Sequence, residues 1–527
     1  MNKKTNKALI WTISIIVFYA VLLVLLVVFE RAGNPDETVI TTFYNAIWYL
    51  LVTITTVGYG DMTPMTPWGR VIGVILMLSS AGLLTFFIGT LFSLFFGKLL
   101  PKSKLFGKRK KTWYIFHPFN DETAVLAENL TETDKDAAYI FLDPDGNSPG
   151  PEYNLSNPIV TGESFSDVLA IHKGNRPVNV FLSEDDGYKN FELGKEIAKE
   201  NVNVYVKTDY VGKDATKDLV LFDRYDCIAR DYWRRFPINL KGETVLIVGA
   251  GKLARKLFSR SILTNVLYDE DRIKYHLFGD WENFVNNHTK LSEILSVNED
   301  TGSNDCVFFH DKMWNADETL IKAADRIIFC EDDEKDNFGR IHEYNEFFVS
   351  KADAYVYASF ELNEGKSFGA DRDIFTPEFV MKQNLNRVAR ELNDLYAERT
   401  GNGTTWDNLS EFKRQSNIAS ADHMLTKIRY LLSDEVIHKI TYDNIRRAAA
   451  VYEELSEEKK IECEMLEHKR WSRFHLMNNW EYDKLRNDNE RKHPLIVPFG
   501  ELSREEQLKD RSAWEVLNDA DIQICYK

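Results

Sequence analysis

The chain has 527 residues, enough for several domains, and its formal net charge of −16 argues against a nucleic-acid partner, because contact with phosphates requires a basic surface. Its five cysteines are widely spaced and include no Cys-x-x-Cys pair. This pattern excludes the common zinc-site and disulfide-framework classes and suits a reducing cytosol.

Two apolar segments predict membrane spans. Residues 8–29 carry no charge, and about 22 residues suffice to cross a hydrocarbon core of about 30 Å. Residues 69–96 are apolar apart from Arg70, and they are longer than a bilayer needs, so we expect this helix to project into the cytosol. Between them, residues 41–55 are apolar but too short to span, which predicts a re-entrant pore helix.

Basic residues flank the two spans. Lys3, Lys4 and Lys7 precede the first span, and a run of lysine and arginine residues fills positions 98–111. The positive-inside rule therefore predicts cytoplasmic N- and C-termini. The acidic residues near the opposite ends, Asp36, Glu37 and Asp61, are then outside, where they concentrate cations.

The stretch between the spans contains Thr56-Val57-Gly58-Tyr59-Gly60, followed by Asp61. This pentapeptide is the signature of potassium selectivity filters, in which backbone carbonyls from four chains replace the water shell of K⁺. Glycine permits the backbone angles that such a filter requires. One chain supplies one filter segment and no Arg-rich sensor helix, so we expect a homotetramer in a lipid bilayer that does not open mainly by voltage.

On these residues, the segment 8–97 resembles the pore of two-transmembrane potassium channels. The resemblance implies that Trp48 and Tyr49 brace the filter and that Asp61 is the family's aspartate after the filter. Gly82 and Gly89 lie near the family's inner-helix hinge, although Ser80 stands where relatives often have the hinge glycine. Gly82 is either a bend or one of several small residues that allow close helix packing.

The next region predicts a doubly wound α/β unit. Short apolar runs suit buried parallel strands, and helical patterns separate them. The expected strands are 113–116, 138–142, 158–160, 179–182 and 203–207, and the expected helices are 122–130, 164–172 and 188–200. The first strand is followed by no glycine triplet, so this unit offers no support for a pyrophosphate site.

A second unit of this type begins at residue 243. Its expected strands are 245–248, 274–278, 306–309, 326–330 and 354–357. The first strand runs into Gly249, Gly251 and Ala254, a glycine turn that fits the dinucleotide fingerprint, with Lys252 available to a phosphate. Asp280 is the preferred ribose-binding acid, and Asp269 has the more usual spacing. The alternative is a glycine turn that only packs the helix on the sheet.

Two such units behind an inner pore helix resemble the RCK gating domains of ligand-gated potassium channels. The resemblance implies a first lobe at 112–240, a second at 241–400, a basic linker at 98–111 behind the pore domain 1–97, and a ring of eight lobes in the tetramer. Ring expansion would pull on the inner helices. Related rings use calcium, and residues 184–186 and 331–334 supply acidic oxygens, but without EF-hand spacing. Solvated loop charge is the alternative.

After a Gly-rich linker, residues 405–527 are mainly helical in pattern and resemble the RyR domain, with departures at Asp483 and Asn487. Their aromatic and basic residues could stack a nucleotide base and neutralise its phosphates. The candidate ligand residues are Trp471, Arg473, Trp480, Tyr482, Arg486, Lys492 and His493. The alternative is that the aromatic residues form a small core and the basic residues pair with nearby glutamates.

The sequence contains no catalytic constellation, so an enzyme is not expected. The leading prediction is a ligand-gated, potassium-selective channel of a plasma (inner) membrane, which family analogy assigns to bacteria. Its cofactors would be K⁺ in the filter, the only expected metal, and a nucleotide such as NAD, ATP, ADP or a cyclic nucleotide. The alternatives are a calcium-gated channel, a membrane-tethered NAD-binding protein without conduction, and a regulatory non-conducting subunit.

Overall fold

A computed structural model describes most of the chain, in two compact units. One unit contains residues 1–107 with 161–163, and the other contains residues 108–160 with 164–527. The described residues are 3–33, 38–95, 99–143, 145–155, 157–173, 175–198, 201–209, 219–302, 304–360, 362, 365–401, 404–433 and 437–527. Asp36, Glu37 and part of the Gly-rich linker at 401–405 lie outside these ranges.

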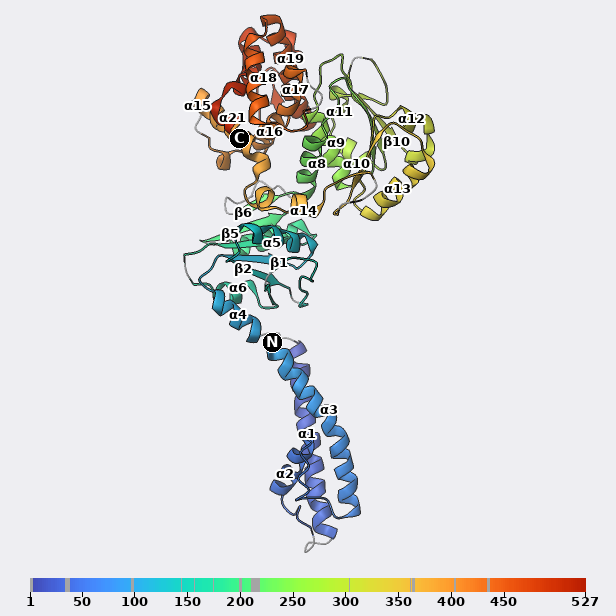
Figure 1. Ribbon diagram of the computed structural model, residues 1–527, viewed down its shortest axis with the longest axis vertical. Helices are drawn as coiled ribbons and strands as arrows, with labels where there is room; N and C mark the ends of the chain where they lie inside the picture. Colours follow the sequence, from blue (N-terminus) through green and yellow to red (C-terminus); the bar gives the residue numbers. More distant parts are fainter. Residues whose placement is uncertain are drawn as a thin grey trace. The chain divides into compact units, whose positions relative to one another are not determined.

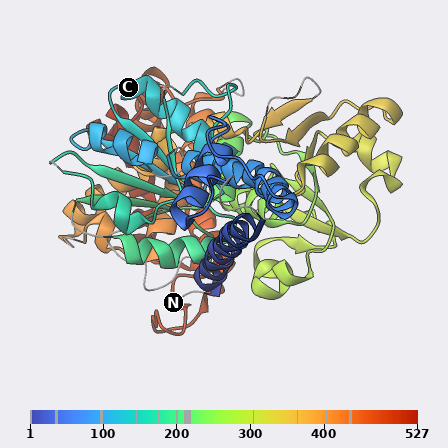
Figure 2. The ribbon, with the colours of Figure 1, turned by 90° about the horizontal axis from the view of Figure 1, so that it is seen from below.

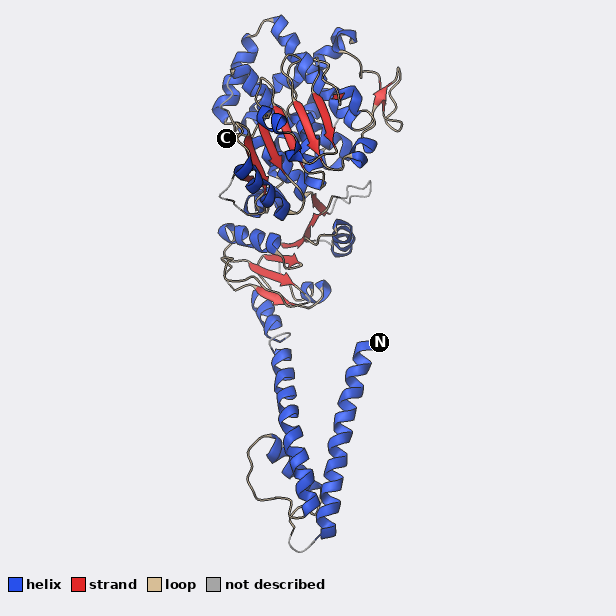
Figure 3. Cartoon of the chain, turned by 90° about the vertical axis from the view of Figure 1, so that its right-hand side faces the viewer, coloured by secondary structure: helices blue, strands red, loops and turns tan. Residues whose placement is uncertain are grey.

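The first unit is helical, as predicted. Two long helices, α1 (Lys3–Gly33) and α3 (Pro67–Leu94), run side by side in opposite directions, and the short helix α2 (Phe43–Ile54) lies beside them (Figure 3). The side chains of Thr42 and Thr66 cap the N-termini of α2 and α3. Figure 2 shows α1 nearly end-on. A further helix, α4 (Leu100–Lys108), occupies much of the segment predicted as a linker.

Within the described residues, two helical segments are long and apolar enough to cross a membrane, Ser14–Gly33 and Pro67–Phe92, with mean hydropathies of 2.5 and 2.4. Their contact is formed by a small apolar core that includes Leu22, Leu26, Ala46 and Leu76. Many other apolar side chains of these helices are exposed, and Leu78 is 76% exposed. Such surfaces need lipid or protein neighbours, since contiguous apolar patches of this extent are rare in water.

The second unit begins with a six-stranded parallel sheet (Figure 1). Its strand order, β3-β2-β1-β4-β5-β6, is that of a doubly wound nucleotide-binding fold. The strands are β1 (Trp113–His117), β2 (Ala138–Leu142), β3 (Ile159–Thr161), β4 (Val178–Leu182), β5 (Val202–Lys207) and β6 (Leu219–Phe222). The helices are α5 (Asp121–Thr133), α6 (Phe165–Leu169), α7 (Gly187–Ile197) and α8 (Arg224–Arg235). The five predicted strands are confirmed, and β6 is additional.

A seven-stranded parallel sheet follows, in the order β13-β12-β11-β7-β8-β10-β9. From β7 the sheet extends to β8 and β10 on one side and to β11, β12 and β13 on the other, which is the same doubly wound order. Strand β9 is an extra strand at the edge next to β10. The strands are β7 (Thr244–Val248), β8 (Lys274–Phe278), β9 (Ser296–Val297), β10 (Cys306–His310), β11 (Arg326–Phe329), β12 (Asp353–Tyr357) and β13 (Lys366–Phe368). The helices are α9 (Lys252–Thr264), α10 (Glu282–Asn287), α11 (Leu291–Ile294), α12 (Glu318–Ala323) and α13 (Glu334–Phe347).

The five predicted strands of the second sheet are also confirmed. The two strands that the sequence pattern did not reveal, β9 and β13, are edge strands of two and three residues, too short for a hydrophobic period to emerge. The two sheets share one continuous hydrophobic core. Helix α8, which follows the first sheet, packs on α9 of the second, and Trp233 Nε1 donates to the Leu257 carbonyl at 2.9 Å.

The remaining chain is mainly helical. Its helices are α14 (Asp371–Ile374), α15 (Arg387–Thr400), α16 (Glu411–Asp422), α17 (Met424–Leu432), α18 (Tyr442–Glu454), α19 (Glu457–Met477), α20 (Arg504–Glu515) and α21 (Ala520–Ile524), with two short strands, β14 (Glu481–Tyr482) and β15 (Lys492–His493). Ala389 of α15 lies in one core with Trp406 and Ile418. Helix α15 therefore packs with the terminal helices, although the expected boundary falls after it, at residue 400.

Candidate functional site

The loop after α2 has an unusual backbone. Thr56, Gly58 and Gly60 have φ values of 60°, 62° and 71°, so every second residue is in the left-handed region. Glycine adopts this region without strain, whereas Thr56 does so at a cost. The amides of Val57 and Gly58 both donate to the Val52 carbonyl, at 3.1 and 3.3 Å, which ties the loop to the end of α2.

Aromatic contacts hold the outer part of this loop. Trp48 Nε1 donates to Asp61 Oδ2 at 3.0 Å, and the rings of Trp48 and Tyr59 stack at 6.2 Å with an interplanar angle of 7°. The hydroxyl of Tyr49 faces α3, where a Cβ added at Gly73 would lie 3.0 Å from it. The structure thus brings Trp48, Tyr59 and Asp61 together and places Tyr49 between α2 and α3.

A buried carboxylate joins the end of α1 to the segment between the filter loop and α3. Glu30, at the end of α1, accepts hydrogen bonds from the Met65 and Thr66 amides at 3.0 Å each and from the Thr38 and Thr66 hydroxyls. This contact fixes α1 to the start of α3. Gly82 and Gly89 of α3 have nothing within 4 Å of an added Cβ, so a single chain does not distinguish a hinge from a packing surface.

The predicted glycine turn joins β7 to α9. Gly249 has a φ of 139°, and an added Cβ would lie 3.0 Å from the backbone of Cys330, so β7 and β11 approach closely here. Gly251 is the N-cap of α9. A Cβ added at Gly251 would lie 2.5 Å from the Asp332 carboxylate, so this carboxylate lies directly against the turn. Ala254 is buried in the shared core.

Asp332 occupies the N-terminus of α9. Its two carboxylate oxygens accept from the Lys252 and Leu253 amides at 2.9 and 3.1 Å. Free amides at this position normally attract a phosphate, because the helix dipole and the unpaired N–H groups favour an anion. In this chain an anion of the protein itself already lies there. The sequence does not reveal this contact, since residues 252 and 332 are far apart in the chain.

The two other predicted nucleotide residues are engaged elsewhere. Lys252 Nζ pairs with Asp209 Oδ2 at 2.7 Å, and this partner raises the pKa of Lys252. Asp280 is exposed and accepts from the Glu282 amide at 3.1 Å, in the loop directly after β8. Asp280 thus lies at the carboxyl end of the strand next to β7, where a ribose-binding acid belongs. Asp269, the alternative, pairs with Lys469 at 2.8 Å.

The corresponding crevice of the first sheet is filled by ion pairs. Glu122, in the first turn of α5, is buried and accepts from Lys207 Nζ at 2.6 Å, from Arg224 Nη1 at 2.8 Å and from the Ser183 hydroxyl. Arg224 Nη2 continues to Asp371 Oδ1 at 2.9 Å. We name these four charged residues, Lys207, Glu122, Arg224 and Asp371, the first-crevice network.

The carboxyl group of Asp371 is buried and has a raised pKa. Burial raises the pKa of Asp371 to about 7, against the opposing effect of Arg224, because the low-dielectric surroundings and the nearby Glu122 and Glu334 disfavour a further negative charge. Asp371 begins α14, which follows the second sheet. The network therefore joins the first sheet to the chain that leaves the second.

The two acidic clusters noted in the sequence occupy equivalent positions. Both follow the strand next to the first strand of their sheet, β4 and β11, and both read Glu-Asp-Asp-x-x-x-Asn, at 184–190 and 331–337. Asn190 exchanges two hydrogen bonds with the backbone of Glu184, and Asn337 does the same with Glu331. This repeat is visible in the sequence, where the acidic residues suggested either calcium ligands or solvated loop charge.

The individual carboxylates of these clusters have separate partners. Asp186 and Asp333 cap α7 and α13, Glu184 lies 3.4 Å from His117, and Glu331 pairs with Arg340 at 3.1 Å. No group of three or more His, Cys, Asp or Glu side chains that could hold a metal ion occurs within the described residues.

In the terminal helices, three of the predicted ligand residues lie together. The rings of Trp471 and His493 are 4.9 Å apart, and those of Trp480 and His493 are 6.2 Å apart, with His475 between them. Trp480 and His493 are buried, and burial lowers the pKa of His475 to about 3 and that of His493 to about 4. These residues form an aromatic core of neutral rings.

The basic members of the predicted cluster have carboxylate partners. Arg486 pairs with Asp488 at 2.7 Å, and Lys492 pairs with Glu490 at 2.9 Å and with Asp483 at 3.4 Å. Tyr482 is 52% exposed. Arg473 lies elsewhere, buried against the second sheet, where it pairs with Asp305 at 2.8 Å. Within the described residues, Arg486 and Lys492 therefore pair with nearby carboxylates, and Arg473 lies apart from the other candidate residues.

Comparison with known proteins shows similarity to potassium channels. The family described as "Ion channel" matches residues 8–97. The calcium-gated potassium channel TvoK of Thermoplasma volcanium is 30% identical over 272 residues, which cover 48% of this chain and 70% of that protein. A voltage-gated potassium channel of Aeropyrum pernix is 45% identical over 62 residues, which cover 12% of this chain and 21% of that protein.

The chain belongs to the potassium-channel family that includes TvoK. Its relatives are membrane proteins and ion channels. Among solved structures, the GsuK channel bound to ADP aligns with 72% of this chain and 99% of that chain at 14% identity, with a TM-score of 0.28. The GsuK channel bound to NAD aligns with 70% and 82% at 11% identity, with a TM-score of 0.27. Scores this low support no structural argument.

Proposed function

We propose that the chain forms a tetrameric, potassium-selective channel whose opening is controlled by a ligand of its cytosolic part. The observation that carries the proposal is the loop at residues 56–60, which combines the filter sequence with positive φ at every second residue. Four such loops around an axis would direct backbone carbonyls to dehydrated K⁺ ions.

The surrounding contacts support these roles. Thr56, Val57, Gly58, Tyr59 and Gly60 would supply the filter, and the contact of Trp48 with Asp61 and Tyr59 would hold its outer end at a fixed width. Helix α2 would be the pore helix, with α1 outside and α3 lining the pore. Gly82 and Gly89 remain the candidate hinge, and both termini would be cytoplasmic.

For the ligand, we propose a nucleotide at the glycine turn of the second sheet. Gly249, Gly251 and Ala254 give the required close approach, and Asp280 lies at the neighbouring strand end. Because Asp332 caps α9, a phosphate there would have to displace its carboxylate. Candidates are NAD, ATP, ADP and cyclic nucleotides.

Calcium is the second candidate ligand. The name of TvoK describes a calcium-gated channel, and this chain places two Glu-Asp-Asp clusters at equivalent strand ends. A calcium site would need these carboxylates to leave their helix caps and ion pairs, since calcium takes six to eight oxygen ligands. The terminal helices, with Trp471, Trp480 and His493 at their centre, are proposed as an RyR-like regulatory module.

Conduction is tested with purified protein in planar bilayers. We expect currents that select K⁺ over Na⁺, and the loss of this selectivity when Gly58 is replaced by alanine, because an L-residue is strained at a φ of 62°. Equal permeability to both ions, or no current under every candidate ligand, would contradict the channel proposal and favour the non-conducting alternatives.

The ligand is tested by adding nucleotides or calcium separately to the cytosolic side. A nucleotide response that disappears in Gly251→Asp supports the glycine turn, because the new carboxylate would clash with and repel a phosphate. A nucleotide response that survives Gly251→Asp places the site elsewhere. A response to calcium alone supports the second candidate.

A further inference from the structure

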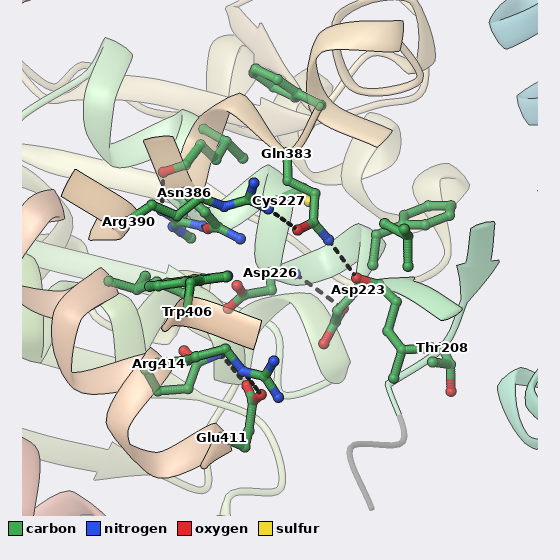
Figure 4. Close-up of a pocket in the computed structure, with 18 of the residues that line it drawn as sticks. Thr208, Asp223, Asp226, Cys227, Gln383, Asn386, Arg390, Trp406, Glu411 and Arg414 are labelled. Atoms are coloured by element: carbon green, nitrogen blue, oxygen red, sulfur yellow. Dashed lines mark hydrogen bonds and ion pairs between the residues drawn. The ribbon is translucent and has the colours of Figure 1, made fainter. Parts of the chain in front are cut away.

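A cavity separate from both crevices lies where the edge of the first sheet meets the helices α15 and α16. Its volume is about 260 Å³, just below the range of about 300–1,000 Å³ that is usual for ligand sites. Strand β6 and helix α8 form one wall, and Gln383, Arg390, Trp406 and Arg414 form the other (Figure 4). No residue of the proposed filter or glycine turn lines it.

Most carboxylates that line this cavity form an ion pair with a lysine or arginine side chain. Asp223 pairs with Lys256 at 2.8 Å, and Asp226 accepts both of its contacts from Arg260, each at 2.7 Å. Although burial opposes it, this bidentate contact holds the pKa of Asp226 below its ordinary value. Glu411 pairs with Arg414 at 3.1 Å, whereas Asp407 is exposed. Cations lying outside the cavity therefore neutralise Asp223 and Asp226.

One cation of the wall has no such partner. The guanidinium of Arg390 has one polar contact within the described residues, from Nη2 to Gln383 Oε1 at 2.9 Å. Its Nε is buried and has no hydrogen-bond partner. Unpaired buried donors are rare in folded proteins and cost roughly 1–3 kcal/mol, so each calls for an explanation. Arg230, by contrast, is saturated by Asp422, Asn386 and the Leu385 carbonyl.

The surroundings of Arg390 fix its position. Its guanidinium carbon lies 5.7 Å from the ring centre of Trp406, within range for a cation–π contact. Gln383 holds it from the other side, and Gln383 Nε2 in turn donates to the Leu221 carbonyl of β6 at 3.0 Å. Gln383 has a φ of 48°, a left-handed conformation that is uncommon outside glycine. A strained residue thus positions the free cation.

A second arginine has unused donors on the same wall. Arg414 contacts Glu411 only through Nε, so its two terminal nitrogens are without a partner in the described part of the chain. In Figure 4, Arg390 and Arg414 lie on either side of Trp406. Arginine side chains with free planar donors match the geometry of phosphate and carboxylate oxygens.

We propose that this cavity binds a small ligand whose oxyanion group, a phosphate or a carboxylate, pairs with Arg390 and Arg414 and whose flat part packs against Trp406. The oxyanion pairs with Nη1 of Arg390, the terminal nitrogen that has no partner within the described residues, and the ring of the ligand stacks on the indole. The site is independent of the proposed nucleotide turn. Because its two walls come from the first sheet and from the terminal helices, a bound ligand holds these two parts together.

The site is tested by equilibrium dialysis of the full-length protein with labelled AMP, inorganic phosphate and malonate. We expect one AMP per chain at this site, bound more tightly than phosphate because of the ring. Arg390→Gln is expected to weaken AMP binding about tenfold or more, since a charge-assisted bidentate contact is lost. The matched control is Arg399→Gln, an exposed arginine of the same helix.

Further measurements distinguish this cavity from the glycine turn, and a phosphate site from a carboxylate site. The Gly251→Asp background removes any AMP bound at the glycine turn, and the Arg390-dependent binding should persist there. If Arg390→Gln fails to fold, Arg414→Gln takes its place, because Arg414 is partly exposed. Displacement of AMP by malonate identifies a carboxylate site, and displacement by phosphate alone identifies a phosphate site, and both support the proposal.

The proposal is overturned if the wild-type chain binds none of the three probes, or if Arg390→Gln, Arg414→Gln and Arg399→Gln all bind AMP as the wild type does. AMP bound no more tightly than phosphate, or unaffected by Trp406→Leu, would refute the role of the ring.

Discussion

The two parallel sheets share a strand order and a Glu-Asp-Asp-x-x-x-Asn motif, yet their crevices differ. In the first crevice, Glu122 pairs with Lys207 and Arg224, and Arg224 pairs with Asp371, so ion pairs occupy the first turn of α5. In the second, glycines leave the turn open and a single carboxylate, Asp332, covers the helix N-terminus.

The difference shows how one fold serves two purposes. A buried network is costly to break, because removing one partner leaves an uncompensated charge, so the first crevice suits a fixed structural joint. A lone capping carboxylate contributes about 1 kcal/mol, which a bound phosphate can replace. Under the proposed function, the second crevice would therefore exchange this internal anion for the phosphate of a ligand.

The largest expected effect comes from breaking the first-crevice network. Glu122→Gln leaves Lys207 and Arg224 without their shared carboxylate, and we expect the free energy of local opening to fall by roughly 3–5 kcal/mol. Hydrogen exchange of the β1 and β4 amides measures this. The control Glu192→Gln removes a surface ion pair with Lys195. This control should change the free energy of local opening by less than about 0.5 kcal/mol. Equal effects of Glu122→Gln and Glu192→Gln would refute the claim that the first-crevice network stabilises the fold more than a surface ion pair does.

The same network predicts a dependence on pH. The pKa of Asp371 is about 7 in the folded chain and near 3.8 when unfolded, so the folded form binds the extra proton between these values. Its contribution to stability is full below about pH 4 and is lost as the pH rises to about 7, by up to about 4 kcal/mol. Denaturant midpoints between pH 4.5 and 8 should show a flatter curve for Asp371→Asn. An unchanged curve would exclude Asp371 as the titrating group.

A smaller effect is expected in the second crevice. Asp332→Ala removes the cap of α9 and should destabilise this helix by about 1 kcal/mol. It also frees two amides, so nucleotide affinity should rise. Asp332→Asn keeps an acceptor and serves as the control. Calorimetric titration measures the affinity, and a nucleotide that binds Asp332→Ala no better than the wild type would show that the carboxylate does not compete.

The smallest expected effect is the difference in stability between two glycine-to-alanine changes, one in the turn at Gly251 and one inside a helix at Gly339. Gly251→Ala would place a Cβ 2.5 Å from the Asp332 carboxylate and should cost about 1 kcal/mol. Gly339→Ala, inside α13 with nothing within 4 Å, should stabilise by up to about 1 kcal/mol. In an Asp332→Ala background the cost at Gly251 should disappear, because neighbouring changes are not additive. Thermal unfolding of the four variants measures this.

The sequence by itself determined the local features of this protein. The apolar runs predicted α1 and α3, the alternation of strand and helix patterns predicted two parallel sheets, and the filter pentapeptide indicated the channel class. These features depend on the hydrophobic period and on short motifs, which residues close in the chain specify. The strands β6, β9 and β13, of four, two and three residues, were not predicted, whereas β3, also of three residues, was.

Contacts between distant residues were decided only by the tertiary structure. Asp332 reaches the helix that begins 80 positions earlier, Arg473 pairs with Asp305 and lies apart from the terminal cluster, and Arg390, on one wall of the cavity, has no carboxylate partner within the described residues. Whether a charged side chain is free or neutralised depends on which partner folding brings within about 4 Å of it, and residue types and local spacing do not contain that information.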